Sequence, residues 1–184
     1  MSSPGGADGD ARDLAVRLTV NGRPVSRVAG AHLTLLRWLR DVAGVTDPKY
    51  GCGEGICGAC TVLVDGEAVS SCLVLAAQVD GTEVVTAAGL CEPGGSLGAL
   101  QRAFHEFHAA QCGFCTPGML MAAAAMLADG RRRSRAQIRS ELHGNLCRCT
   151  GYGPIVDAVE AALRAVRSDP DQPGPPAGAE AAAQ

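Results

Sequence analysis

The sequence of 184 residues has few aromatic side chains, little net charge and no long apolar run. Phe, Trp and Tyr make up 3% of it, so its apolar mass is mainly Ala, Val and Leu. A formal charge of −3 gives no electrostatic basis for binding nucleic acid, which requires a concentrated basic face. No apolar run approaches the ~18 residues that a membrane span needs. We therefore expect a soluble protein, whose 47% of hydrophobic residues suffice for a buried core.

Several motifs of enzyme active sites are also missing. There is no P-loop and no convincing acid–base dyad, so we expect no catalytic residue and no substrate site in this chain. The four histidines are scattered and do not have the spacing of a Rieske centre, which pairs two histidines with two cysteines. The first ten residues lack the basic and apolar stretches of a signal peptide. These observations indicate a reducing compartment, the cytoplasm, where clustered cysteines usually bind metal or carry out redox chemistry.

Nine cysteines are present, and four of them form a first group. Cys52, Cys57 and Cys60 have the spacing C-x4-C-x2-C, and Cys72 follows after eleven residues. This is the arrangement of plant-type ferredoxins, which bind a [2Fe–2S] cluster. Zinc is the alternative, but zinc sites usually pair two short knuckles rather than use one long loop. Glycine lets a backbone come close enough for N–H groups to point at sulfur, and it interleaves with these ligands at Gly51, Gly53, Gly55 and Gly58.

A second group combines Cys112 and Cys115, spaced C-x2-C, with Cys147 and Cys149, spaced C-x-C. Zinc and a thioredoxin-like redox pair are alternatives for this spacing, although the βαβ pattern of thioredoxins is missing. The remaining cysteine, Cys91, lies outside both spacings, and we expect it to be a packing residue.

Helix starts support a second cluster. Thr116 and Pro117 are predicted as N-cap and first residue of one helix, and Pro154 is placed to begin another. Each cysteine pair thus precedes a helix N-terminus, where the dipole and free N–H groups favour an anion. A [2Fe–2S] cluster bound by four thiolates is such an anion.

The hydrophobic pattern divides the chain into four parts. Residues 1–13 and 168–184 are predicted to be disordered tails, 14–92 a domain rich in strands, and 93–167 a helical domain. We expect the linker at Glu92–Gly95 and a solvated loop at the arginines 131, 132, 133 and 135. The expected strands are 14–20 paired with 23–28, 61–64 paired with 67–71, and 82–86. Helices are expected at 34–42 and 117–127, and a further one is expected to be capped by Ser134 and Gln137. Two more helices are indicated by apolar faces, one formed by Leu97, Leu100, Phe104 and Phe107, and one by Ile155, Val159, Ala162 and Val166.

Two longer motifs name a family. The loop Gly55–Cys60 (GICGAC) also resembles loops of plant ferredoxins and of succinate dehydrogenases. Gln111–Gly118 (QCGFCTPG) and Gly144–Tyr152 (GNLCRCTGY) resemble the paired signatures of the small iron–sulfur subunit of the xanthine oxidase family of molybdenum hydroxylases, of the carbon monoxide, aldehyde or xanthine dehydrogenase type. The likeness extends from about Leu14 to Val166.

This resemblance implies an α+β fold, with an N-terminal ferredoxin-like β-grasp domain followed by a C-terminal four-helix domain. Each domain would hold one [2Fe–2S] cluster. The implied partners are a large subunit that binds molybdopterin and molybdenum and a medium subunit that binds FAD, in a heterotrimer or a dimer of heterotrimers. The helical-domain cluster would lie nearer molybdenum, with Gln111 and Cys149 facing the pterin, and the other cluster nearer the flavin.

The implied function is an electron relay from molybdopterin to FAD within an oxidoreductase. Relatives act on carbon monoxide, purines, aldehydes or aromatic heterocycles, and the choice of substrate resides in the large subunit. The competing hypotheses are an interaction module stabilised by zinc and a two-cluster ferredoxin that works alone.

Overall fold

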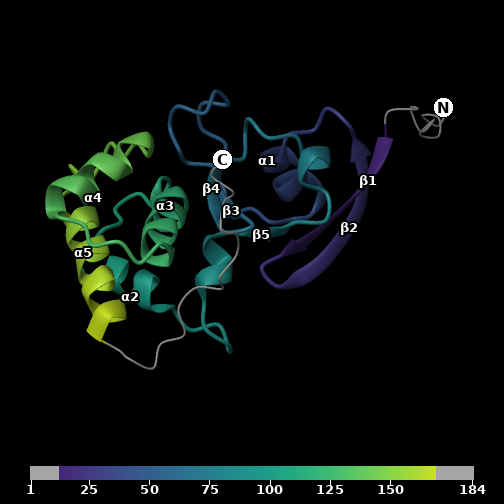
Figure 1. Ribbon diagram of the computed structural model, residues 1–184. Coiled ribbons are helices and arrows are strands. Elements are labelled where there is room, and N and C mark those ends of the chain that lie inside the picture. Colours follow the sequence, from purple (N-terminus) through teal and green to yellow (C-terminus); the bar gives the residue numbers. More distant parts are fainter. Residues whose placement is uncertain (1–12, 169–184) are drawn as a thin grey trace, which may run out of the picture.

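The computed structural model describes residues 13–168, and the predicted tails lie outside this range apart from their boundary residues Asp13 and Ser168. Asp13 begins the first strand and Ser168 ends the last helix. The chain forms a mixed α and β structure, in which a five-stranded sheet lies beside a group of helices (Figure 1). We refer to these as the sheet half and the helical half.

The sheet is mixed, with the strand order β2-β1-β5-β3-β4. Two hairpins form it, and β5 lies between them, parallel to β1 and antiparallel to β3. Asn21-Gly22 and Asp65-Gly66 make the hairpin turns, where all four residues have positive φ, as tight hairpin turns require. The strands are β1 (Asp13–Val20), β2 (Arg23–Gly30), β3 (Thr61–Val64), β4 (Glu67–Ser70) and β5 (Glu83–Val85).

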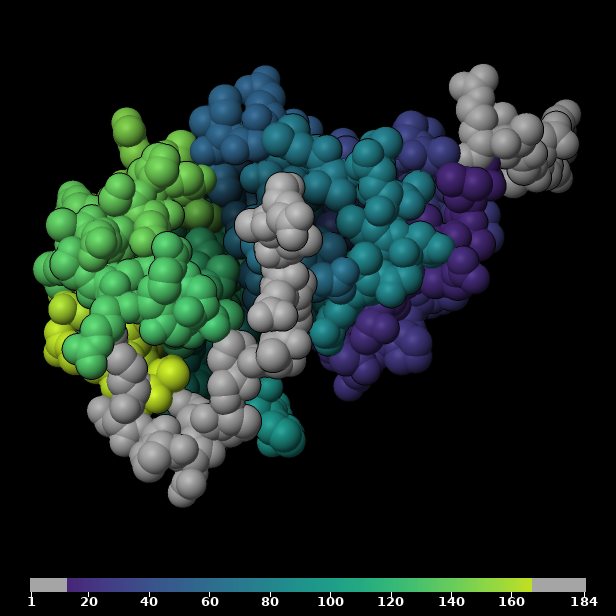
Figure 2. Space-filling view, viewed as in Figure 1, coloured from purple at the N-terminus to yellow at the C-terminus, as the bar shows by residue number. Residues whose placement is uncertain are grey.

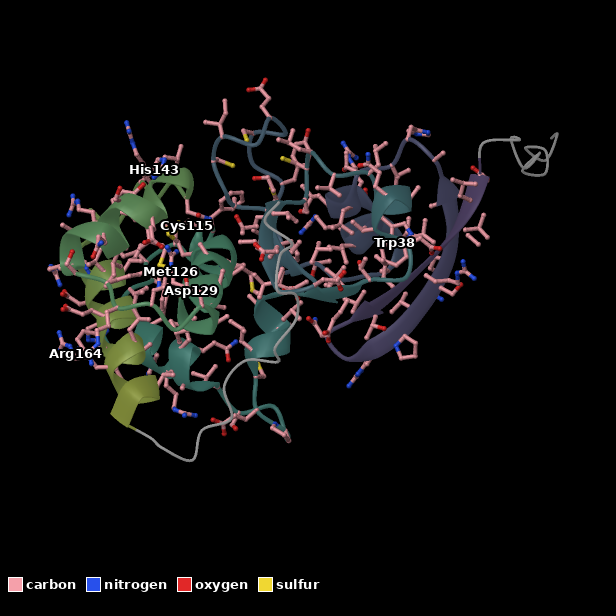
Figure 3. All side chains as sticks on the ribbon, viewed as in Figure 1. Trp38, Cys115, Met126, Asp129, His143 and Arg164 are labelled. Carbon is pink, nitrogen blue, oxygen red and sulfur yellow. The ribbon has the colours of Figure 1, made fainter. Side chains whose placement is uncertain are left out.

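One short helix crosses the sheet. It begins as α1 (Leu35–Arg37) and continues as the π-helical η1 (Trp38–Val42), which matches the predicted extent of 34–42. Thr34 caps it by accepting the N–H of Arg37 at 3.4 Å. Trp38, labelled in Figure 3, is fully buried against the sheet and anchors the core of this half. Two 3-10 turns, η2 (Ala76–Val79) and η3 (Ala87–Leu90), complete the sheet half.

The helical half contains α2 (Ala99–Glu106), α3 (Thr116–Ala128), α4 (Arg135–Glu141), η4 (Leu142–Gly144) and α5 (Gly153–Ser168). Its core is built from fully buried side chains of α3, α4 and α5, including Met119, Ile138 and Ile155. In residues 13–168 no helix is both long and apolar enough to cross a membrane.

Two details of the predicted helices are wrong. Leu97 and Phe107 fall outside α2 and are 44% and 41% exposed, so the predicted apolar face shrinks to Leu100 and Phe104. Thr116 does not cap α3, because the helix starts one residue earlier with Cys115 at the N-cap. The Thr116 hydroxyl is instead buried without a hydrogen-bond partner. By contrast, the capping box of α4 is confirmed, since Ser134 and Gln137 exchange bonds of 3.3 and 2.8 Å.

Strand β3 belongs to both halves. Its side chains alternate, so that Val62 enters the core of the sheet half and Leu63 packs against α3 in the core of the helical half. Next to it the backbones touch, because a Cβ added to Gly118 of α3 would lie 2.1 Å from Gly58 O. In Figure 2 the green helical residues lie directly against blue and teal residues of the sheet half.

The arginine cluster between α3 and α4 is not uniformly solvated. Arg131 and Arg132 are exposed, as predicted, but the side chain of Arg133 is only 3% exposed. Its guanidinium donates to Asp129 at 2.7 Å, to Glu141 at 2.8 Å and to Met126 O at 2.9 Å. These bonds close the loop from α3 onto α4, and they hold the pKa of Asp129 well below its ordinary value.

Replacing Arg133 should therefore destabilise the helical half. We expect Arg133→Gln to lower the free energy of unfolding at pH 7 by about 2 kcal/mol, since charged hydrogen bonds are lost. The lowered pKa of Asp129 stabilises the folded state above the ordinary carboxyl pKa of 3.8, and this contribution is lost as the pH falls further. The difference between variant and wild type should therefore shrink below about pH 4.

Urea unfolding at pH 7 and pH 3 measures both effects. The matched control is Arg132→Gln, an exposed neighbour, which should change the free energy of unfolding by less than about 0.5 kcal/mol. Equal effects of the two substitutions would contradict the role given to Arg133.

Candidate metal centres

The first cysteine group lies on the loop before β3, and its backbone points at sulfur. The Cys52 sulfur accepts N–H groups from Glu54, Ile56 and Cys57 at 3.3 to 3.4 Å, and the Cys52 N–H donates to the Cys57 sulfur at 3.4 Å. The N–H groups of Glu54 and Cys57 lower the pKa of Cys52 to about 6. Cys52 and Cys57 thus form a pair in which one sulfur is prepared to be an anion at neutral pH.

Cys60 and Cys72 form the inner pair of this group. They are 2% and 7% exposed, and they pack on Leu36, the second residue of α1. Burial, followed by donation of its thiol to Cys60, raises the pKa of Cys72 to about 11. Gly55, with φ of +73°, turns its N–H onto the Cys72 sulfur, a conformation that favours glycine. Cys72 also interacts electrostatically with Cys52, so the structure brings both pairs of the group together.

The second group is assembled from two distant segments. The Cys149 thiol lies 3.5 Å from the Cys112 sulfur, and both residues are exposed. Cys115 lies deeper, labelled in Figure 3 at the start of α3; burial, followed by donation of its thiol to Cys147, raises its pKa to about 12. Cys112 interacts electrostatically with Cys115 and Cys147, so all four predicted residues meet at one place.

Hydrogen bonds also prepare this site for negative charge. The N–H of Phe114 and then the thiol of Cys149 lower the pKa of Cys112. Burial opposes ionisation of Cys147, but the Thr150 hydroxyl at 3.2 Å and the Thr150 N–H at 3.5 Å lower its pKa overall. Each group therefore combines sulfurs that favour the thiolate with a buried sulfur that resists it.

The arrangement of sulfurs fits a diiron cluster. Each group consists of two pairs, 52 with 57 and 60 with 72 in the first, and 112 with 149 and 115 with 147 in the second. A [2Fe–2S] cluster held by four cysteines needs such a set, because each of its two irons takes two protein sulfurs. In the described part of the chain, no three His, Cys, Asp or Glu side chains converge as ligands of a single ion.

The two groups are joined by the segment Asn145–Cys147. Leu146 donates its N–H to Cys57 O at 2.9 Å, which links a residue next to Cys147 with a cysteine of the first group. The buried Asn145 side chain donates to Gly58 O at 2.9 Å and to Thr61 Oγ1 at 3.1 Å. Sequence reasoning gave Asn145 no role, and only its position inside the GNLCRCTGY motif could have indicated one.

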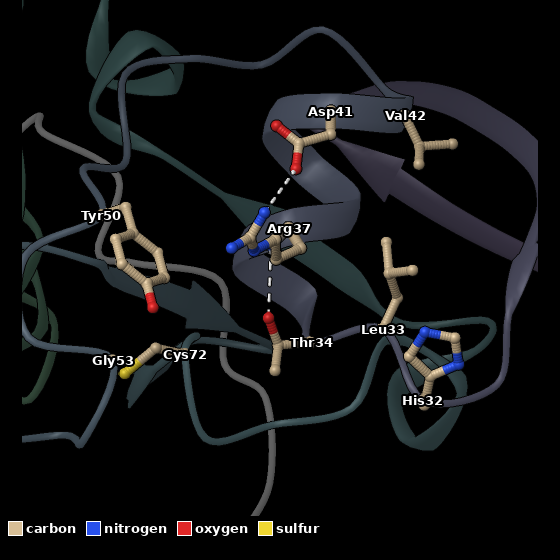
Figure 4. Close-up of a pocket in the computed structure, with 9 residues that line it drawn as sticks. All are labelled: His32, Leu33, Thr34, Arg37, Asp41, Val42, Tyr50, Gly53 and Cys72. Atoms are coloured by element: carbon tan, nitrogen blue, oxygen red, sulfur yellow. Dashed lines mark hydrogen bonds and ion pairs between the residues drawn. The ribbon is translucent and has the colours of Figure 1, made fainter.

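An open pocket of about 560 Å³ borders the first group (Figure 4). Cys72 lies on one wall, and Arg37 of α1 lies on another, 3.6 Å from Asp41 and stacked over the ring of Tyr50 at 5.2 Å. The Arg37 guanidinium therefore lines the same pocket as the Cys72 sulfur. The lining residues are His32, Leu33, Thr34, Arg37, Asp41, Val42, Tyr50, Gly53 and Cys72.

The other predicted residues are also placed. Gln111 is exposed next to Cys112, on the open side of the second group. Cys91 is partly buried, and its sulfur lies 3.6 Å from Gln101 Nε2, which belongs to neither cysteine group. This surrounding agrees with the packing role expected for Cys91.

Comparisons with known proteins agree with this geometry. The family described as "2Fe-2S iron-sulfur cluster binding domain" matches residues 18–89, and the family described as "[2Fe-2S] binding domain" matches residues 86–160. The caffeine dehydrogenase subunit gamma of Pseudomonas sp. (strain CBB1) is 46% identical over 149 residues, which cover 79% of this chain and 89% of that protein. The xanthine dehydrogenase iron-sulfur-binding subunit of Escherichia coli O157:H7 is 47% identical over 148 residues, covering 79% and 92%.

A solved structure, quinoline 2-oxidoreductase from Pseudomonas putida 86, has a chain that superposes with a TM-score of 0.81 at 43% identity. The match covers 86% of this chain and 98% of that one. Two [2Fe–2S] binding domains and relatives of this similarity make the chain an electron-transfer iron–sulfur subunit of an oxidoreductase. The chain belongs to the xanthine oxidase family of molybdenum hydroxylases, among its small iron–sulfur subunits.

Proposed function

We propose that this chain relays electrons one at a time from a molybdopterin centre in a large partner subunit to FAD in a medium partner subunit. Bound [2Fe–2S] clusters supply the one-electron chemistry. The observation that carries the proposal is the bond between Leu146 N–H and Cys57 O at 2.9 Å, because it fixes the two cysteine groups next to each other. A relay needs this, since donor and acceptor must stay at a set distance.

Eight cysteines are the proposed cluster ligands, four in each group. Backbone N–H groups on Cys52 and the Thr150 hydroxyl on Cys147 stabilise negative charge on the ligand sulfurs. The chain's own part in the reaction is to hold these sulfurs, donate hydrogen bonds to them and keep the two sites in contact. The proposed ligands are Cys52, Cys57, Cys60 and Cys72, and Cys112, Cys115, Cys147 and Cys149.

The exposure of each site supports a proposed neighbour for it. Cys112, Cys149 and Gln111 are all exposed, so the second site is open on the side where we place the pterin, with Gln111 and Cys149 facing it. The first site opens toward the pocket beside Cys72, where we place the flavin subunit. Electrons would then enter at the second site and leave from the first.

Exposed apolar side chains next to both cysteine loops support partner subunits. Phe114 and Leu146 flank the second site and are 48% and 51% exposed, and Ile56 and Leu73 flank the first at 61% each. Large apolar side chains gathered in this way mark surfaces that a partner covers. A heterotrimer, or a dimer of heterotrimers, would cover them, whereas a ferredoxin that works alone would leave them in water.

The proposed domain organisation follows the two groups. We place a ferredoxin-like β-grasp domain at 14–92 and a four-helix domain at 93–167, each with one cluster. We also place the chain in the cytoplasm, because clustered cysteines that bind metal are typical of a reducing compartment.

Metal analysis provides the first test. The chain purified without oxygen should contain about four irons and absorb visible light, as two [2Fe–2S] clusters require. Co-purification with two larger chains at fixed stoichiometry is expected as well. Stoichiometric zinc in colourless protein would support the interaction module instead, and a monomer that carries the whole activity would support the independent ferredoxin.

Substitution of one ligand tests the assignment of the second site. Cys149→Ser should remove the electron paramagnetic resonance (EPR) signal of the second cluster, spare that of the first, and stop electron transfer out of molybdenum, because the four ligands act together. The matched control is Cys91→Ser, which should keep both signals and normal turnover. Two intact signals and full turnover in Cys149→Ser would refute the ligand set.

A further inference from the structure

All three backbone N–H groups of the segment Asn145–Cys147, and the carbonyl of Asn145, form hydrogen bonds. Asn145 N–H donates to Leu142 O at 3.0 Å, and Leu146 N–H donates to Cys57 O at 2.9 Å. Cys147 N–H donates to the hydroxyl of Tyr152 at 3.0 Å, and the same hydroxyl donates to Asn145 O at 3.1 Å. One tyrosine hydroxyl therefore holds both ends of the three-residue segment.

The Asn145 side chain holds the segment from the opposite side. Its amide donates to Gly58 O and Thr61 Oγ1, both in the sheet half and more than eighty positions away in sequence. Asn145 is 6% exposed, so water does not compete for these bonds. A single residue is thus bonded to the sheet half through its side chain and to Tyr152 through its carbonyl.

Tyr152 is itself fixed on the helical half. Its ring packs against the helical core, and its carbonyl accepts the N–H of Val156 in the first turn of α5. Its φ is +68°, a region that side chains other than glycine rarely occupy. The disfavoured backbone is what brings the hydroxyl of a helix-anchored ring back to the segment that carries Cys147.

We propose that Tyr152 and Asn145 are positioning residues that clamp the segment Asn145–Cys147 between the two halves and so fix the geometry between the two cysteine sites. The inference rests on the proposed function, in which the two sites exchange electrons. The exchange oxidises one site by one electron and reduces the other by one, with no transfer of atoms or protons. The clamp touches neither set of sulfurs through its side chains, and it acts by holding the backbone that connects them.

Tyr152→Phe removes the hydroxyl and keeps the ring, so it is the most direct test. Hydrogen–deuterium exchange in the full complex should become about fivefold faster at the amide of Cys147, the factor expected for its lost hydrogen bond. Exchange should also become faster at Leu146, because the segment that carries its bond to Cys57 O is no longer held. Pulsed EPR on the reduced protein should show a broadened dipolar splitting between the two clusters, with iron content unchanged. The matched control is Thr82→Val, which also removes a hydroxyl hydrogen bond, that to Val79 O at 2.8 Å, but lies outside the clamp and should leave both measurements as in wild type.

Asn145→Ala provides a second variant in case Tyr152→Phe loses iron. Gly58 O keeps two donors in this variant, the N–H of Thr61 at 3.1 Å and the Thr61 hydroxyl at 2.7 Å, so only Thr61 Oγ1 loses a donor. Faster exchange at Leu146 and a broadened splitting in this variant would support the clamp. Unchanged exchange and splitting in both variants, with both clusters present in wild type, would overturn the clamp and leave the relay standing. Absence of iron from wild type would overturn the relay, and exchange at Leu146 alone would then decide the clamp.

Discussion

The arrangement of this subunit depends on direct backbone contacts between glycines, in which Gly58 of the first cysteine loop lies against Gly118 and Gly144. A Cβ on Gly118 would lie 2.1 Å from Gly58 O, and a Cβ on Gly58 would lie 2.4 Å from Gly144 O. No side chain can separate these surfaces, so the loop of the first cysteine group is pressed against the start of α3, directly after Cys115. The nearness of the two sites is therefore set by main-chain packing, which tolerates little adjustment.

Within each site the protein prepares some sulfurs for negative charge and shields others from water. Cys52 has a pKa of about 6 because N–H groups surround it, whereas burial raises the pKa of Cys115 to about 12. A metal must therefore displace protons from the buried thiols, whereas it finds the Cys52 sulfur largely ionised at neutral pH. Four thiolates close together would repel one another strongly without that metal, so the folded shape and the bound group depend on each other.

Local patterns in the sequence predicted the features that depend on neighbouring residues. The hydrophobic pattern predicted the strands of both hairpins, Ser134 predicted a helix start, and the cysteine spacing predicted two groups of four. Features that depend on remote partners were out of reach. Arg133 looked like one more exposed charge because its partners Asp129 and Glu141 come together only after α3 and α4 have packed.

The same reason explains the residues of the joint and one misplaced cap. Asn145 acts through Gly58, 87 positions away, and nothing in its neighbourhood indicates that contact. Thr116 fitted the pattern of an N-cap, but Cys115 already has helical backbone angles, so the helix begins at Thr116 with Cys115 as its N-cap. Strand β3 has a consequence of its own. Val62 and Leu63 point into different cores, so neither half could be exchanged alone between relatives. In a chimaeric subunit, strand β3 would come from one parent, and its side chains would face a core from the other parent to which they are not matched.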